Sequence, residues 1–159
     1  MKTISILIAA VVLVTSAAAS TDLFIGRWIL DVQHSKYPAG ACPKSMVIEM
    51  ETAGTGIRYH SETTYANGSK TQANYHATYN GQQAVVMGAR GMLLPVSLKK
   101  IDHHTVVASY ARLLQVVATS RRVVSADGQI MTITTISRDA AGKRVTTIGV
   151  YEKQHEQQR

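Results

Sequence analysis

Residues 46–81 read MVIEMETAGTGIRYHSETTYANGSKTQANYHATYNG, and the fold predicted for the whole chain follows from the pattern of this segment. Met46, Ile48 and Met50 alternate with other residues, so they would share one face of a strand. Glycine and asparagine then recur where tight hairpin turns need a positive φ, at Ala53-Gly54-Thr55-Gly56, Asn67-Gly68 and Asn80-Gly81. The segment therefore predicts consecutive antiparallel strands.

The rest of the chain continues this pattern, with further turn signals such as Asp127-Gly128 and Ala141-Gly142. No stretch of ten or more residues shows a convincing helical period. The predicted strands are 25–32, 45–53, 56–65, 70–79, 82–88, 93–101, 104–112, 115–124, 129–138 and 143–153. An open sheet of this length would expose two edges, and closure removes them. The prediction is an all-β fold, a single up-and-down antiparallel barrel of about ten strands.

The start of the chain predicts a cleaved secretory signal peptide over residues 1–19, with an apolar run and the small residues Ala17-Ala18-Ala19 before the cut. The barrel domain would then be residues 20–159, with 16 basic and 10 acidic residues and a net charge of +6. Cys42 is the single cysteine, which excludes an intrachain disulfide. These features predict a secreted or periplasmic protein, and we expect a monomer.

Several stretches resemble known barrel proteins. Gly26-Arg27-Trp28 is similar to the opening of lipocalins and fatty-acid-binding proteins, and Val150-Tyr151-Glu152-Lys153 resembles the last strand of the latter. Taken with further matches along the chain, the sequence looks like a family of secreted bacterial lipocalin-like proteins of uncharacterised function. The resemblance implies a calycin-type barrel in which Trp28 closes one end.

Two departures from the fatty-acid-binding proteins bear on the ligand. Those proteins carry an arginine two residues before the tyrosine of their last strand, and here that position is Gly149. They also carry a helical lid, for which Gln33–Lys44 is too short and too rich in proline. A fatty-acid carrier of that kind is therefore not expected, whereas another apolar ligand is compatible with the sequence.

No catalytic motif is recognisable, so we predict a protein that is not an enzyme and that needs no cofactor and no metal. His103 and His104 are adjacent and would point in opposite directions on a strand. A two-residue turn at Asn67-Gly68 would pair His60 with Tyr75, and would keep His60 and His76 on opposite faces. The basic residues are dispersed without an aromatic platform, which argues against a nucleic-acid partner.

The predicted function is to bind a small, mostly apolar ligand inside the barrel. Tyrosines supply apolar rings and orienting hydroxyls, and the predicted lining is Tyr59, Tyr75, Tyr79, Tyr110 and Tyr151. The alternative is a solid, ligand-free barrel that acts as an interaction module for the envelope or for another protein. The sequence does not decide which strand faces point inward.

Two predicted hairpin tips are unusually apolar. We expect them to form a barrel mouth made of Arg90, Met92, Leu93, Leu94, Arg112, Leu113 and Leu114. Such tips are normally Gly, Asn, Asp or Ser. The mouth would pass an apolar ligand or touch an anionic membrane surface. The alternative is that the leucines begin strands and point inward.

Overall fold

The computed structural model describes residues 22–89 and 94–155, and Arg90, Met92 and Leu93 of the predicted mouth lie outside this part. The described residues form strands, turns and bends without a helix, so none of them belongs to a helix that could span a membrane. The strands are Gly26–Lys36 (β1), Ser45–Ala53 (β2), Gly56–Thr64 (β3), Lys70–Thr78 (β4), Asn80–Ala84 (β5), Met87–Ala89 (β6), Val96–Asp102 (β7), Thr105–Arg112 (β8), Gln115–Val124 (β9), Ile130–Arg138 (β10) and Arg144–Gln154 (β11).

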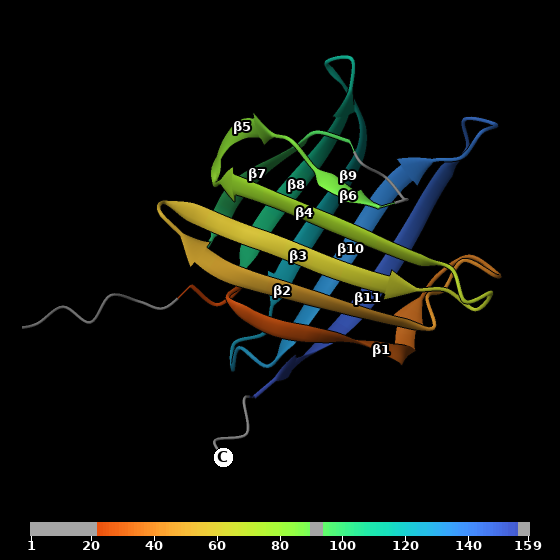
Figure 1. Cartoon of the computed structure of the whole chain (residues 1–159), viewed down its shortest axis with the longest axis horizontal. Helices are drawn as coiled ribbons and strands as arrows, with labels where there is room; N and C mark the ends of the chain where they lie inside the picture. Colours follow the sequence, from red (N-terminus) through yellow and green to blue (C-terminus); the bar gives the residue numbers. More distant parts are fainter. Residues whose placement is uncertain (1–21, 90–93, 156–159) are drawn as a thin grey trace, which may run out of the picture.

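All neighbouring strands are antiparallel in one sheet of order β5-β7-β8-β9-β10-β11-β1-β2-β3-β4-β6. The sheet curls so that β2, β3 and β4 cross in front of the strands that carry the second half of the chain (Figure 1). Its interior holds a core of buried apolar side chains. The predicted all-β, up-and-down antiparallel fold is confirmed.

The predicted strand 82–88 is instead two short strands. Asn80–Ala84 (β5) pairs with β7, whereas Met87–Ala89 (β6) pairs with β4, so one continuous segment supplies both edges of the sheet. Gly88 allows the second pairing, since a Cβ there would lie 1.9 Å from the carbonyl oxygen of Gln72. The segment 80–89 therefore forms two strands, and each of them is one edge of the sheet.

The register between β3 and β4 also differs from the prediction by one residue. Tyr59 pairs with Tyr75, and His60 pairs with Asn74. The reason is the turn, in which the Gly68 amide donates to the carbonyl of Tyr65 and Gly68 has a φ of 78°. This is a three-residue hairpin loop with glycine in the left-handed region. Both tyrosines therefore point to the inside of the barrel.

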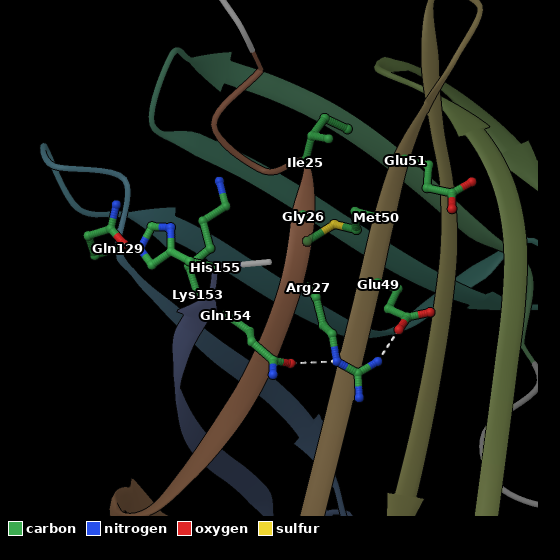
Figure 2. Close-up of a pocket in the computed structure, with 10 residues that line it drawn as sticks. All are labelled: Ile25, Gly26, Arg27, Glu49, Met50, Glu51, Gln129, Lys153, Gln154 and His155. Atoms are coloured by element: carbon green, nitrogen blue, oxygen red, sulfur yellow. Dashed lines mark hydrogen bonds and ion pairs between the residues drawn. The ribbon is translucent and has the colours of Figure 1, made fainter. Parts of the chain in front are cut away.

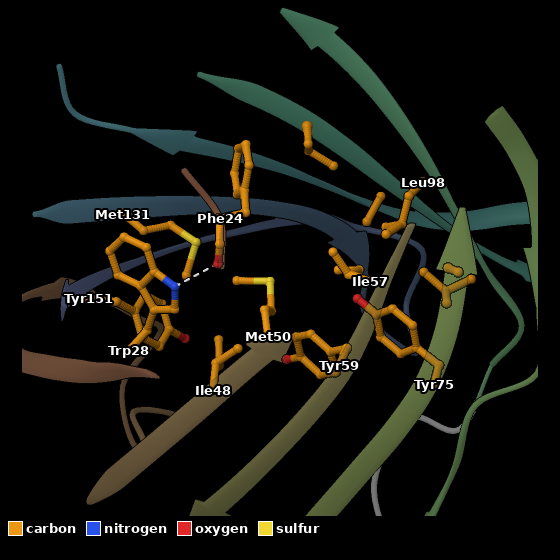
Figure 3. Packing of buried hydrophobic residues seen from close by; sticks show 14 of the residues in the cluster. Phe24, Trp28, Ile48, Met50, Ile57, Tyr59, Tyr75, Leu98, Met131 and Tyr151 are labelled. Carbon is orange, nitrogen blue, oxygen red and sulfur yellow. Dashed lines mark hydrogen bonds between the residues drawn. The ribbon is translucent and has the colours of Figure 1, made fainter. Parts of the chain in front are cut away.

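The barrel has two different ends. At the first, which we call the closed end, chain connections join β2 to β3, β4 to β5, β7 to β8 and β9 to β10. Trp28 is fully buried there, and its Nε1 donates to the Phe24 carbonyl at 2.9 Å. Figure 3 shows this bond, with Met131 and Tyr151 beside the indole. Trp28 thus occupies the closing position that the resemblance implies.

The opposite end, which we call the open end, carries the connections β1–β2, β3–β4, β6–β7, β8–β9 and β10–β11. The β8–β9 connection is the two-residue turn Leu113-Leu114, because Arg112 pairs with Gln115. Both leucines have positive φ, 46° and 70°. Left-handed backbone costs an ordinary residue about 1–2 kcal/mol, and asparagine-glycine is the usual sequence for such a turn.

Replacing Leu113-Leu114 by Asn-Gly should therefore stabilise the protein. We expect the free energy of unfolding to rise by about 1–2 kcal/mol, since the strain is relieved and no buried contact is lost. Urea denaturation followed by the fluorescence of Trp28 measures the change. An Ala-Ala variant is the control, because it removes the side chains and keeps the strain. Equal stability of the two variants would contradict the prediction.

Candidate functional site

A cavity of about 230 Å³ lies inside the barrel towards the open end. Its walls come from the inward faces of the strands and from the connections after β1 and β3. The lining residues are Tyr37, Ala41, Pro43, Met46, Ile48, Tyr59, Thr63, Tyr65, Tyr110, Ser120, Arg122, Ile133, Thr135, Thr147 and Tyr151. The cavity is thus bordered by tyrosines and by one arginine.

Among the described residues of this lining, Arg122 is the only charged one, and it is 2% exposed. It belongs to β9, where Ala118, Ser120, Arg122 and Val124 alternate on the inward face. Its Nη2 donates to the hydroxyl of Tyr75 at 2.8 Å and more weakly to that of Tyr110 at 3.4 Å. The guanidinium also lies over the ring of Tyr59, 5.2 Å from its centroid.

The charge of Arg122 has no anionic partner in the part of the chain that the structure describes. Its buried Nε has no hydrogen-bond partner among those residues either. Burial opposes the charged form, but the oxygens of Tyr75, Tyr110 and Tyr59 outweigh it, and the pKa lies above the ordinary arginine value. The site therefore presents a permanent positive charge with a free donor.

Tyrosines surround this charge. The rings of Tyr59 and Tyr75 stack with centroids 4.4 Å apart, directly across the β3–β4 pair. Burial raises the pKa of both phenols, although Arg122 acts in the opposite direction. Both phenols stay neutral at ordinary pH, so the hydrogen bond to Tyr75 and the cation–π contact with Tyr59 do not neutralise the guanidinium.

Gly149 stands at the position where the fatty-acid-binding proteins carry an arginine, and other side chains occupy the space beside it. A Cβ at this position would lie 2.7 Å from Cε2 of Tyr151 and 3.0 Å from the hydroxyl oxygen of Tyr37. The two tyrosines therefore fill the space beside β11. The positive charge of the cavity comes from Arg122 on β9 instead, a residue that the motif comparison did not identify.

The fold is shared with a solved structure. Comparison with solved structures finds zebrafish ileal bile acid-binding protein, crystallised with cholic acid, at a TM-score of 0.53. The two sequences are 11% identical, and the match covers 83% of this chain and 99% of the other. The chain has a calycin-like fold. Comparison with protein-family models and with curated protein sequences finds no match.

Three of the five predicted tyrosines, Tyr59, Tyr110 and Tyr151, line the cavity of this calycin-like barrel. Tyr75 lies behind them and holds Arg122. Tyr79 differs from the prediction, because it lies at the closed end and donates to Asp22 Oδ2 at 2.7 Å. Tyr79 follows the last paired residue of β4 and continues the inward face of that strand. The alternation along β4 therefore predicts an inward side chain, but this side chain lies at the closed end and not in the cavity.

Arg122, Tyr37 and Tyr65 were not predicted from the sequence. Alternation along Ala118–Val124 contained the signal for Arg122, since a small or apolar side chain stands at every second position. Tyr37 and Tyr65 lie in connections that fold over the open end, where no strand period applies.

The described residues of the predicted mouth lie as follows. Leu113 and Leu114 are 96% and 91% exposed, so the alternative of inward-pointing leucines does not hold for this turn. Arg112 is exposed, and Leu94 is half-buried. The apolar tip of the β8–β9 hairpin is therefore real, and it stands at the end where the cavity lies.

The histidines do not assemble a site. His60 hydrogen-bonds to Asn74 at 2.6 Å, and His76 to the carbonyl of Ala53 at 3.2 Å, both on the outside of the barrel. His103 and His104 meet edge to face. Within residues 22–89 and 94–155, no group of three or more His, Cys, Asp or Glu side chains is placed to hold a metal ion.

A larger groove of about 1130 Å³ lies at the closed end (Figure 2). Its surface is about equally polar and apolar, and most of its charged residues form ion pairs or hydrogen bonds with side chains. Arg27 pairs with Glu49 and bonds to Gln154 at 2.7 Å, while His155 bonds to Gln129 at 2.5 Å. Lys153 is the exception: it donates to the carbonyl of Leu23 at 3.3 Å and lies over the ring of Trp28, and it is only half-buried. The smaller cavity holds the more deeply buried charge, since Arg122 is 2% exposed, so we take it as the candidate site.

Proposed function

We propose that this protein is a secreted or periplasmic, non-enzymatic binding protein that holds a small, mostly apolar ligand with one anionic group inside its barrel. Arg122 supports the proposal most strongly. A buried charge costs free energy unless a partner compensates it. Within the described part of the chain no carboxylate does so, and Nε remains free. A ligand anion would supply the missing partner.

The cavity walls favour a ligand whose remainder is apolar or aromatic. The rings of Tyr59, Tyr110 and Tyr151, with Ile48 and Ile133, offer apolar surface on several sides of Arg122. Ser120 and Thr135 already bond to each other at 2.7 Å. Among the described lining residues, the guanidinium is the one group that offers a charge-assisted hydrogen bond, which fits a ligand with a single charged group.

The size of the cavity limits the ligand. Sites for drug-sized molecules usually enclose about 300–1,000 Å³, and this one encloses about 230 Å³. The closed half of the barrel is filled by Phe24, Trp28, Met50, Ile57 and Leu98. A short-chain or single-ring carboxylic acid fits this space better than a long fatty acid or a steroid.

That filled half also supports the alternative, a ligand-free barrel that acts as an interaction module. The two functions differ in what they require of Arg122. A binding protein needs the guanidinium for its ligand, whereas an interaction module keeps its function without it. Direct binding measurements therefore separate them.

The test compares acids with neutral analogues of the same shape. We expect the protein to bind phenylacetate or octanoate about 10–100-fold more tightly than 2-phenylethanol or octanol, because a hydrogen bond to a buried charge contributes about 1.5–3 kcal/mol. Tyrosine and Trp28 fluorescence or calorimetry measures the affinities. Native mass spectrometry of protein from its own host would identify a copurifying molecule.

Arg122→Met should lose the preference for acids, and Arg121→Met is the matched control, since Arg121 is the exposed neighbour on the same strand. Thermal unfolding confirms that both variants fold. Absence of any binding in the parent, with no copurifying molecule, would favour the interaction module. Equal affinity for acid and alcohol would exclude the anionic anchor.

A further inference from the structure

The β8–β9 hairpin presents two large apolar side chains to solvent at its extreme tip. Leu113 and Leu114 are almost completely exposed, and Val116 on the same hairpin is 55% exposed. The leucines also occupy left-handed positions, where asparagine and glycine would fit without strain. Neither core packing nor turn geometry explains them, and exposed apolar groups of this kind mark interaction sites.

The charges of the same end are mainly positive. Seven exposed basic residues lie in the open-end connections or at the strand ends beside them: Lys36, Lys44, Lys70, Arg112, Arg138, Lys143 and Arg144. The described acidic residues counted in the same way are Asp139 in the β10–β11 connection and Glu62 near the end of β3. None of the seven forms an ion pair with another described residue.

The closed end is different, because it combines both signs. Asp22, Glu49, Glu51, Asp102, Asp127 and Glu152 lie in its connections or at the strand ends beside them. Three cations there are paired, Arg27 with Glu49, Arg58 with Glu51 and Lys100 with Asp22. Among the described residues, the net positive charge is therefore concentrated at the end that carries the leucine tip.

We propose that the open end docks on an anionic phospholipid surface, with Leu113 and Leu114 inserted at the boundary between headgroups and acyl chains. The exposed cations around the tip then lie at the level of the lipid phosphates. A bilayer fits better than a folded partner, because the apolar residues form a narrow projection and a protein interface needs a broad, complementary patch. The hairpin tip at the top of Figure 1 stands clear of the front strands, so an approaching surface can reach it.

Both components of the surface contribute to docking in this arrangement. The basic residues attract the protein to an anionic leaflet, and this attraction weakens with salt. The leucines then hold it by burying apolar area. Docking does not depend on the proposed ligand, since Arg122 lies inside the barrel and outside the contact.

Cosedimentation with vesicles tests the proposal. The parent protein should bind equimolar phosphatidylglycerol–phosphatidylcholine vesicles at least about tenfold more strongly than pure phosphatidylcholine vesicles, and added salt should weaken the binding. Leu113→Asn with Leu114→Gly should reduce the binding about tenfold or more, because the inserted apolar area is lost. That variant is expected to fold at least as stably as the parent, so misfolding would not explain the loss.

Two further variants separate the contributions. Lys143→Gln with Arg144→Gln should weaken binding to anionic vesicles by about fivefold per removed charge. Ile101→Ser, an exposed apolar residue near the closed end, should leave binding unchanged. Arg122→Met should also bind vesicles normally, whatever its effect on ligands. Failure of the parent to bind anionic vesicles, self-association through the tip, or full binding by the Asn-Gly variant would overturn the proposal.

Discussion

Replacing Trp28 by alanine is expected to lower the free energy of unfolding by about 4–5 kcal/mol, counting both the cavity and the lost hydrogen bond. The indole is the largest of the fully buried side chains. Its removal leaves a hole between Phe24, Ile48 and Met131, which the strands cannot close without losing their pairing. The Phe24 carbonyl also loses the donor that satisfies it.

An effect of this size matters because small domains have a total stability of about 5–15 kcal/mol. We expect Trp28→Ala to be close to unfolded at elevated temperature. Urea denaturation followed by circular dichroism measures its loss of stability. Ile29→Ala is the control, since Ile29 is the next residue on β1 and is 36% exposed. It should cost about 1 kcal/mol or less. Similar losses in both variants would show that the indole does not hold the closed end together.

The sequence predicted the barrel because its strands and turns carry local signals. Met46, Ile48 and Met50 have the period of a half-buried strand, and glycine appears where the backbone needs a positive φ, as at Gly68 and Gly128. Both signals depend only on neighbouring residues. Fold class and the position of most turns could therefore be predicted without a structure, whereas about ten strands were predicted and eleven are observed.

Register and edges could not be predicted in the same way. The difference between a two-residue and a three-residue loop at Asn67-Gly68 reverses the face of every residue on β4 relative to β3, and the sequence allows both. The division of the segment 80–89 depends on how the sheet curls, because β5 and β6 become its two opposite edges. The curl brings together strands far apart in sequence, so no local pattern contains it.

The candidate site was predicted in part for the same reason. Three of the predicted tyrosines line the cavity because large amphipathic side chains on strands of a barrel often face its interior. Arg122 was missed because an arginine beside another arginine is ordinarily taken as part of a solvated surface. The burial of Arg122 follows only from the three-dimensional structure, which shows that this face of β9 points inward and that Tyr75 and Tyr110 lie beside the guanidinium.

The buried tyrosines predict a sharp loss of stability in alkali. Burial is the largest cause that raises the pKa of Tyr37, Tyr59, Tyr75, Tyr79 and Tyr151 in the folded protein. Below a pH of about 10, the ordinary tyrosine pKa, these phenols are protonated in both the folded and the unfolded chain, and their contribution to stability is complete. Above it, the unfolded chain releases protons that the folded protein retains.

Since the unfolded state then binds fewer protons, the free energy of unfolding falls as the pH rises. Each fully buried phenol contributes at most about 1.4 kcal/mol per pH unit, so Tyr59, Tyr75 and Tyr151 together reach about 4 kcal/mol per unit while they remain protonated in the folded state. The half-buried Tyr37 and Tyr79 contribute less, because solvent screens them. We expect cooperative unfolding within about two pH units above 10. Arg122 opposes the shift at Tyr59 and Tyr75, but burial outweighs it.

Absorbance of tyrosinate and far-ultraviolet circular dichroism, recorded on the same sample, test this prediction. The five phenols should ionise in the same step in which the β-sheet signal is lost, because unfolding exposes them to water. Tyr59→Phe removes one of the linked protons, so its unfolding should depend less steeply on pH and should occur at a higher pH than in the parent. Ionisation of all the tyrosines while the circular dichroism stays unchanged would mean that the rings around Arg122 are open to solvent. A cavity of that kind would not hold a buried charge in need of a ligand anion, so the alkaline titration also examines the physical basis of the proposed function.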